Sequence, residues 1–280
     1  MTFAAFEEYI CKTLAEAGVE NSRIEAANLL SEILDLSNSE LAFCKASGRL
    51  LDEKQQAMLD CALKRRAARE PLQYISGRTY FRDLVLEVNP SVLIPRFETE
   101  ILVDHIIKKA PTGAAVLDIG TGSGAIAISC AVERKDFKVL AVDVSASALE
   151  TAQRNALKYK ADNLKFLQSD LFSSIAPDVR FDVVAANLPY VTFEEYEVLQ
   201  PEVKSFEPQL ALTAPSEGLE LIFNVCCQLD ARLKNGGFAI FEMSPHQTAK
   251  VAELLKSLGF VASVISDYTS RERFVCAEKR

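Results

Sequence analysis

The feature that most constrains the fold is an alternation of short apolar strands with longer helical segments, which begins near Phe97 and continues through the rest of the chain. The strand candidates are 115–119, 139–142, 164–167, 181–186 and 238–241, and the helical patterns between most of them are 126–132, 147–158, 219–233 and 247–258. Strands this apolar are expected to carry helices on both faces, as in a parallel sheet. The pattern predicts an α/β fold with a doubly wound, mostly parallel sheet.

The last two strand candidates, 261–265 and 273–277, have only a short turn between them. A parallel connection needs a crossover of a dozen or more residues, so this pair must be antiparallel. We expect an antiparallel hairpin at the edge of the sheet.

The first 70 residues or so read as consecutive helices with no strand signal. Phe3, Phe6, Ile10 and Leu14 recur every three or four residues, and Asp52 can cap a later helix that ends before Pro71. A length of 280 residues suits one large domain with a smaller attachment. We therefore predict a helical domain over 1–75, a β-hairpin linker over 76–96 and an α/β domain over 97–280.

The linker is predicted from alternating apolar residues after Tyr80. Leu84, Leu86 and Val88 alternate with Val85 and Glu87, and Asn89-Pro90 is a turn signal before the apolar run 92–94. The pattern predicts a hairpin that turns at Asn89-Pro90.

A glycine-rich turn links the first strand of the α/β region to a helix. Glycine lets the backbone approach a ligand closely, and the free N–H groups of a new helix favour an anionic group. The spacing is not that of dinucleotide binders, and no lysine follows as it does in a P-loop. The residues expected to bind a nucleotide-like cofactor are Gly120, Thr121, Gly122, Ser123 and Gly124.

Acidic residues follow the next two strands. Asp143 lies roughly 20 residues beyond the glycines, where a carboxylate accepts the ribose hydroxyls of an adenosine ligand. Asp170 and Leu171 follow the third strand, where they could flank an adenine. The alternatives are that Asp143 caps the helix that begins at Ser145 and that Asp170 is a turn residue.

The fourth strand runs into Asn187-Leu188-Pro189-Tyr190. An amide and an aromatic ring on one tight loop at a strand end can hold a planar nitrogen nucleophile. Pro189 pushes Leu188 toward an extended conformation. Together with the glycine turn, this loop indicates methyl transfer to an amide or amino nitrogen.

The composition excludes several classes of protein. A net charge of −8 argues against non-specific grip of a nucleic-acid backbone, and the basic cluster Lys64, Arg65, Arg66 and Arg69 is expected to be a solvated helix face. The 7 cysteines form no C-x-x-C pair, and the 2 histidines lack metal-ligand spacing, so we expect no metal. The absence of a signal peptide or a 20-residue apolar run predicts a cytoplasmic protein without membrane association.

These motifs, in this order, resemble the class I S-adenosylmethionine-dependent methyltransferases. The resemblance implies a Rossmann-like seven-stranded sheet with S-adenosylmethionine across the carboxyl ends of the first strands. Residues 187–190 resemble the Asn-Pro-Pro-Tyr signature, with Leu188 in place of the first proline. The resemblance implies catalytic roles for Asn187, Leu188, Pro189 and Tyr190, and places Asn187 beside the cofactor.

Three further segments, 73–77, 92–100 and 207–212, closely resemble the release factor glutamine methyltransferases. Members of that family methylate the glutamine side-chain amide in the Gly-Gly-Gln loop of peptide chain release factors, and their helical domain helps to engage that protein. The chain departs from the family at Phe97, where proline is usual, and at Met243-Ser244 and Ser270, where glycine is usual.

Two other functions stay open at this point. An N6-adenine methyltransferase could use the same loop for an exocyclic amine, although the acidic balance and the lack of a basic, aromatic-rich domain oppose it. A non-catalytic partner protein could keep the fold as a binding module. The joint presence of the glycines, Asp143 and Asn187 argues against a protein that has lost its catalytic function.

Overall fold

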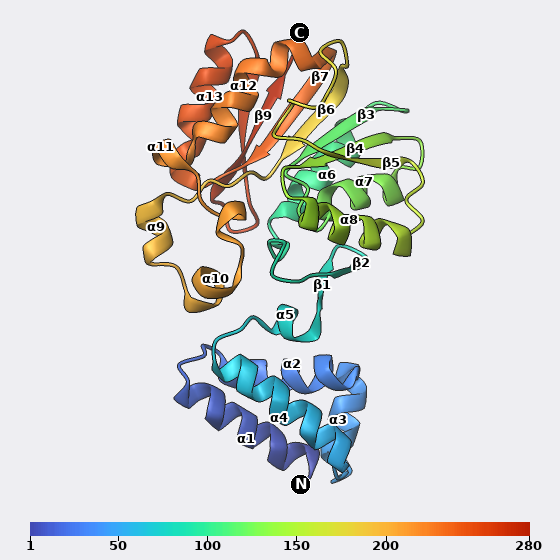
Figure 1. Cartoon of the computed structure of the whole chain (residues 1–280), viewed down its shortest axis with the longest axis vertical. Coiled ribbons are helices and arrows are strands. Elements are labelled where there is room, and N and C mark those ends of the chain that lie inside the picture. Colours follow the sequence, from blue (N-terminus) through green and yellow to red (C-terminus); the bar gives the residue numbers. More distant parts are fainter. The chain divides into compact units, whose positions relative to one another are not determined.

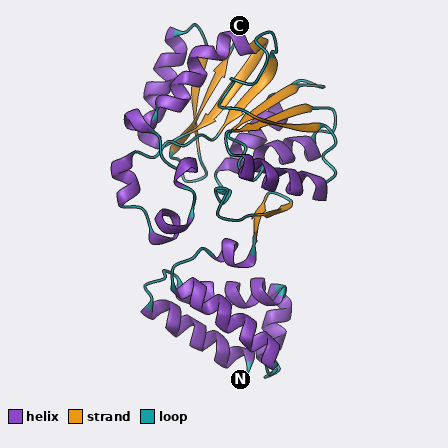
Figure 2. Cartoon of the chain, viewed as in Figure 1, coloured by secondary structure: helices purple, strands orange, loops and turns teal.

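The computed structural model describes residues 1–280, except for the side chain of Ser216. The chain divides into two compact units. The first unit comprises Met1–Gly77 together with the distant segment Gln200–Phe206, and the second comprises Arg78–Leu199 and Glu207–Arg280. Figures 1 and 2 show that the first is helical and that the second contains the large sheet.

The helices of Met1–Gly77 pack their apolar faces into one core, to which the helix in Gln200–Phe206 contributes no buried residue. Phe3, Phe6, Ile10 and Leu14 are all buried in it, as their spacing predicts. The predicted cap at Asp52 forms a capping box with Gln55, because each side chain bonds the other's backbone N–H. The helices are α1 Phe3–Glu16, α2 Ser22–Leu34, α3 Asn38–Ala46, α4 Glu53–Ala67, α5 Leu72–Ser76 and, from the distant segment, α10 Pro201–Phe206.

The expectation that the basic cluster is a solvated helix face is wrong for Arg66 and Arg69, whereas Lys64 and Arg65 are exposed as expected. Arg66 is buried and pairs with Glu25 at 2.9 Å and with Glu202 at 3.0 Å. Arg69 also pairs with Glu202, at 2.6 Å. The sequence pattern missed these partners because Glu202 lies more than 130 residues away along the chain.

The second unit is built on a seven-stranded sheet with the order β5-β4-β3-β6-β7-β9-β8 (Figure 1). Its neighbours are parallel except at β9, which is antiparallel to both β7 and β8. The strands are β3 Ala115–Ile119, β4 Lys138–Asp143, β5 Leu164–Gln168, β6 Phe181–Ala186, β7 Leu233–Glu242, β8 Val261–Ser266 and β9 Glu272–Glu278. The predicted doubly wound sheet with an antiparallel final hairpin is confirmed.

Helices cover both faces of this sheet. On one face Val116 and Val183 belong to a core shared with α6 and α7, and on the other Leu117 and Val184 belong to a core shared with α12 and α13. Successive strand residues point to opposite faces, so a strand covered on both sides must be apolar throughout. The helices are α6 Thr99–Lys109, α7 Ala125–Glu133, α8 Ala146–Lys158, α12 Glu220–Arg232 and α13 Thr248–Ser257.

The small hairpin turns earlier than the sequence pattern indicates. Strands β1 Arg78–Phe81 and β2 Leu84–Glu87 pair across a two-residue turn, so the prediction that the hairpin turns at Asn89-Pro90 is wrong. The chain does turn at Asn89-Pro90, where the Val92 N–H donates to the Asn89 carbonyl oxygen at 3.1 Å, but that turn joins no pair of strands. Arg82 takes a positive φ of 50° in that turn, and its side chain bonds Asp104 and Glu133. Such long-range contacts stabilise a turn that lacks glycine. The Asn89 side chain instead accepts from the backbone N–H of Ser91 in a local turn.

The segment between β6 and α12 was largely unassigned by pattern. It forms α9 Phe193–Glu197, α10, the short 3₁₀ helix η1 Gln209–Ala211 and α11 Pro215–Gly218, and a second 3₁₀ helix, η2 Pro245–Gln247, precedes α13. Strand β7 begins at Leu233, five residues before the predicted 238. The prediction missed its first half because residues 234–236 are polar or glycine and break the apolar pattern.

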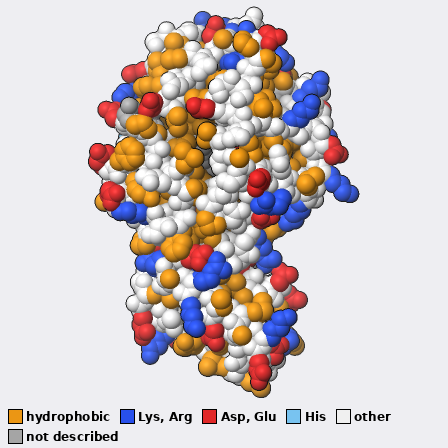
Figure 3. Space-filling model, in the orientation of Figure 1, with side chains coloured by type: hydrophobic (Ala, Val, Ile, Leu, Met, Phe, Trp, Pro, Cys, Tyr) orange, Lys and Arg blue, Asp and Glu red, His pale blue; other side chains and the backbone are white. Residues whose placement is uncertain are grey.

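The surface gives two further observations. On the face drawn in Figure 3, acidic and basic side chains are interspersed. Among the described helices none is both long and apolar enough to cross a lipid bilayer.

Candidate functional site

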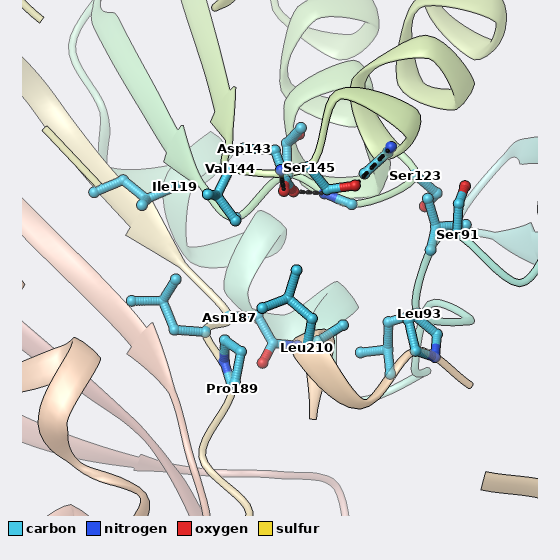
Figure 4. A pocket seen from close by; sticks show the side chains of 18 of the residues that line it. Ser91, Leu93, Ile119, Ser123, Asp143, Val144, Ser145, Asn187, Pro189 and Leu210 are labelled. Carbon is cyan, nitrogen blue, oxygen red and sulfur yellow. Dashed lines mark hydrogen bonds between the residues drawn. The ribbon is translucent and has the colours of Figure 1, made fainter. Parts of the chain in front are cut away.

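A cavity of about 570 Å³ opens at the carboxyl ends of β3, β4 and β6 (Figure 4). Strand order reverses between β3 and β6, and ligands of open α/β sheets bind in the crevice at such a switch point. Of the predicted site residues, those that line the cavity are Gly120, Thr121, Gly122, Ser123, Asp143, Leu171, Asn187, Leu188 and Pro189. Gly124 and Tyr190 are not among the lining residues.

The glycine turn has the backbone conformation that only glycine adopts without strain. Gly120 and Gly124 have φ values of 73° and 86°. A Cβ atom on Gly124 would lie 2.7 Å from Ile128 Cδ1, and one on Gly120 would lie 3.0 Å from Leu188 Cδ2. The same Cβ on Gly124 would lie 3.2 Å from Ala152 Cβ of α8, so Gly124 allows the start of α7 to pack closely against α8. Gly120 allows Leu188 to approach the turn.

Asp143 at the end of β4 connects the glycine turn to α8. Its two carboxylate oxygens accept from the backbone N–H groups of Gly122 and Ser145, each at 2.9 Å. Burial raises the pKa of Asp143 and the backbone hydrogen bonds oppose the rise. The start of α8 itself is capped by the Ser145 side chain, which accepts from Ala148. Asp143 thus orders both segments while it also lines the cavity.

The turn after β5 supplies another part of the wall. Asp170 and Leu171 both line the cavity. Leu171 takes a positive φ of 48°, which is unusual for a residue with a branched side chain. The Ser169 hydroxyl donates to the Leu171 carbonyl oxygen at 2.9 Å and accepts from the Ser174 N–H, so the turn is held from within.

A third carboxylate lies near the turn, inside the predicted strand 115–119, and was not predicted to be a site residue. Asp118 is fully buried in β3 and accepts from the Thr121 hydroxyl at 2.7 Å. Its Oδ1 atom has no hydrogen-bond partner among the described residues. Burial raises the pKa of Asp118 to about 7. A lone acidic residue inside an apolar strand was the signal that could have identified it.

The Asn187 loop forms the opposite side of the cavity from Asp143, as Figure 4 shows. The Asn187 side-chain nitrogen donates to the Thr99 hydroxyl at 3.3 Å. Tyr190 lies next to charged groups that include Glu242 and Arg273, and burial raises the pKa of its hydroxyl to about 12. The loop therefore places residues 187–189 at the cavity and Tyr190 behind them.

Sequence reasoning passed over several residues that support this loop. Thr99 lines the cavity and donates to the buried Glu242 at 2.7 Å. Arg96 pairs with the buried Glu207 at 2.7 Å. Burial raises the pKa of Glu207, and Arg96 opposes that rise. The sequence did show a carboxylate beside each segment, with Glu242 after the apolar run 238–241 and Glu207 at the start of 207–212. It did not show which residue each carboxylate would contact.

No group of three or more His, Cys, Asp or Glu side chains that could hold a metal ion occurs among the residues that the structure describes. The 7 cysteines are unpaired thiols.

Comparison with known protein families matches two regions. Residues 97–205 match the "Methyltransferase small domain" model, and residues 8–77 match the "PrmC N-terminal domain" model. Among solved structures, the chain is similar to a methyltransferase from Pyrococcus furiosus with a TM-score of 0.55 and 19% identity, covering 71% of this chain and 90% of that one. At this identity the likeness shows the fold alone.

Curated relatives extend the match to nearly the whole chain. A release factor glutamine methyltransferase of Geobacter sulfurreducens is 39% identical over 247 residues, which cover 88% of this chain and 86% of the relative. The enzyme of the same name from Fusobacterium nucleatum is 34% identical over 269 residues, covering 95% of this chain and 76% of the relative. A methyltransferase fold, a matching helical region and this extent of identity together place the chain in the release factor glutamine methyltransferase family.

Proposed function

We propose that the protein transfers a methyl group from S-adenosylmethionine to the side-chain amide nitrogen, N5, of the glutamine in the Gly-Gly-Gln motif of peptide chain release factors. The observation that carries this proposal is that Asn187 and Leu188 line the same cavity as the glycine turn and Asp143. A nucleotide-like ligand and a planar amide would therefore meet in one place.

The cavity suits S-adenosylmethionine in size and chemistry. About 570 Å³ lies within the usual range for small-molecule sites, and most of the lining is apolar. We assign the adenosine end to Asp143, Asp170 and Leu171, and the amino-acid end to the turn Gly120–Gly124. That turn contains no Lys or Arg, which suits a ligand that has a carboxylate but no phosphate. When bound, this cofactor supplies an electrophilic methyl group.

The residues on the Asn187 side would bind and orient the glutamine amide. An amide nitrogen is a poor nucleophile because its lone pair is delocalised into the carbonyl. If Asn187 Oδ1 and the Leu188 carbonyl oxygen each accept one N–H, the lone pair is aimed at the methyl group. Tyr190 would support the loop from behind or stack on the amide. The chemistry needs no strong base, since the nitrogen loses its proton only after it has become cationic.

The helical unit is proposed to engage the release factor. Its region matches a domain that occurs in this family, and the three arginines of its basic cluster are paired with Glu25, Glu70 and Glu202. Paired arginines are poor phosphate ligands, so we propose a protein substrate and no direct nucleic-acid contact. Action on release factors in translation termination also fits a cytoplasmic location, where free cysteines stay reduced.

The decisive experiment is incubation of the full chain with S-adenosylmethionine and either a release factor, a Gly-Gly-Gln peptide, or DNA and RNA. Methylation replaces one hydrogen by a methyl group, so mass spectrometry should find about 14 mass units added at the glutamine of the intact factor. Methylated adenine would support the nucleic-acid alternative. Cofactor binding without transfer to any protein or nucleic acid would support the binding-module alternative.

A further inference from the structure

Three polar side chains from separate segments are hydrogen-bonded in a row that runs from the cavity wall, at Asn187 and Thr99, to the buried Glu242. The Asn187 amide nitrogen donates to Thr99 Oγ1 at 3.3 Å, and Thr99 Oγ1 donates to Glu242 Oε2 at 2.7 Å. Thr99 is the first residue of α6, and Glu242 is the last residue of β7. Only 4% of Thr99 and 3% of Glu242 is exposed, so water does not readily replace either partner.

Glu242 fixes which group donates and which accepts in each of these hydrogen bonds. An ionised carboxylate only accepts hydrogen bonds, so Thr99 must donate its single hydroxyl proton to Glu242. The Thr99 oxygen then has only lone pairs to offer, and the Asn187 group that faces it must be the NH₂. The two ends of a carboxamide have nearly the same shape, so a hydrogen-bond partner is what selects between its two orientations.

We propose that Thr99 and Glu242 are positioning residues that hold the Asn187 carboxamide with its NH₂ toward Thr99, so that Oδ1 is the atom presented to the substrate amide. The proposal rests on the function proposed above, because that function requires an acceptor at this position. A carboxamide turned the other way would present NH₂ to NH₂, and the substrate could not bind in the productive orientation.

The charges around Glu242 decide how much of it is ionised. The groups that act on it are Arg273 of β9, Arg96 and Glu98 before α6, and the hydroxyl of Tyr190 after β6. Burial raises the pKa of Glu242 to about 7, while the Thr99 hydrogen bond and the two arginines oppose the rise. Protonated Glu242 can donate to Thr99, which removes the directional constraint. Productive orientation should therefore be favoured more strongly at pH 8 than at pH 6.

The first test removes the hydroxyl of Thr99 and then restores it. Thr99→Val, which keeps the shape, should lower kcat for a release factor about 10- to 100-fold and leave the dissociation constant of S-adenosylmethionine within about twofold. Thr99→Ser should recover most of the loss. A kcat within twofold of wild type for Thr99→Val, or equal losses for the valine and serine variants, would overturn the proposal.

Thr248→Val is the matched control. Thr248 is also fully buried at the start of a helix, and its hydroxyl lies 3.1 Å from Glu272 Oε2, but it does not line the cavity. This variant should lower the melting temperature about as much as Thr99→Val does while kcat stays unchanged. Equal losses of kcat in the two valine variants would mean that general destabilisation, and not orientation of Asn187, explains the Thr99 effect.

The second test compares wild type with Glu242→Gln over pH 6 to 8. Glutamine can donate or accept, so it resembles the protonated carboxyl and no longer sets a direction. The ratio of wild-type to variant kcat should rise several-fold from pH 6 to pH 8, and taking the ratio cancels other groups that titrate in both proteins. A ratio independent of pH would contradict the proposal. A wild-type protein that methylates no release factor would instead refute the proposed function.

Discussion

The two sides of the cavity are held together by contacts of very different range along the chain. On the cofactor side, Asp143 bonds Gly122 and Ser145, which are 21 and 2 residues away. On the Asn187 side, the separations are 88 residues to Thr99 and a further 143 from Thr99 to Glu242. The cofactor side is therefore assembled mostly by local turns, whereas the side proposed for chemistry depends on the complete sheet.

This difference implies that damage on each side should have a distinct kinetic signature. Changes on the cofactor side should act on cofactor affinity and on the order of nearby turns. Changes on the Asn187 side should act on kcat, because they disturb how the substrate amide is aimed. The following predictions test whether the two sides separate in this way.

The largest effect is expected for Asn187→Ala. Loss of one precisely placed hydrogen-bonding group in an active site typically lowers kcat by about 10²- to 10³-fold. The affinity for S-adenosylmethionine, measured by calorimetry, should change no more than about twofold. If cofactor affinity falls as far as kcat, the proposed division between the two sides is wrong.

Asp143→Ala should weaken cofactor binding by about 10- to 100-fold, since hydrogen bonds to a charged group contribute about 1.5–3 kcal/mol. With saturating cofactor, kcat should stay within a few-fold of wild type. Asp143→Asn is the matched control, because it retains one acceptor oxygen for the turn or α8. A kcat loss that saturating cofactor does not repair would place Asp143 on the chemical side instead.

Asp118 gives a prediction about stability and pH. Its pKa rises from the unfolded value of 3.8 to about 7 in the fold, so the folded chain binds more protons between these values. The contribution of Asp118 to the free energy of unfolding then falls as pH rises through that window, by on the order of 2 kcal/mol between pH 5 and pH 7. Thermal melts of wild type and Asp118→Asn should show a shallower pH slope in the variant. Parallel slopes would contradict the assignment.

The smallest effect is expected for Ser270→Gly, in the turn between β8 and β9. Ser270 has a φ of 65°, a left-handed backbone conformation that is strained for serine and not for glycine. Relief of strain, less the extra entropy of glycine in the unfolded chain, should raise the free energy of unfolding by about 0.5 kcal/mol. Chemical denaturation measures this value, provided that the dependence of the free energy of unfolding on denaturant concentration is the same in both proteins. A lower stability would show that the strain is already offset by the hydrogen bonds that Asp267 Oδ1 accepts from the N–H groups of Thr269 and Arg271.

Local patterns accounted for most of the fold and for the residues that form the Asp143 side of the cavity, where we propose that the cofactor binds. Buried strands such as 115–119 and 181–186 were predicted to the residue, because only apolar side chains tolerate burial on both faces of a sheet. The hairpin turn at Arg82 was missed because long-range ion pairs replace the usual turn residues there. The pairing of Arg66 with Glu202 was missed because α10, which carries Glu202, is remote from α4 in sequence.

The sequence by itself determined the α/β architecture, the glycine turn and the positions of Asp143 and Asn187, since each depends on periodicity or on the residues next to it. Only the tertiary structure decided which groups meet Asn187. Thr99, Glu242 and the Arg96–Glu207 pair lie on segments that come together when the parallel strands align their carboxyl ends. Hydrogen bonds between residues so far apart follow from that packing, and no local pattern along the chain encodes them.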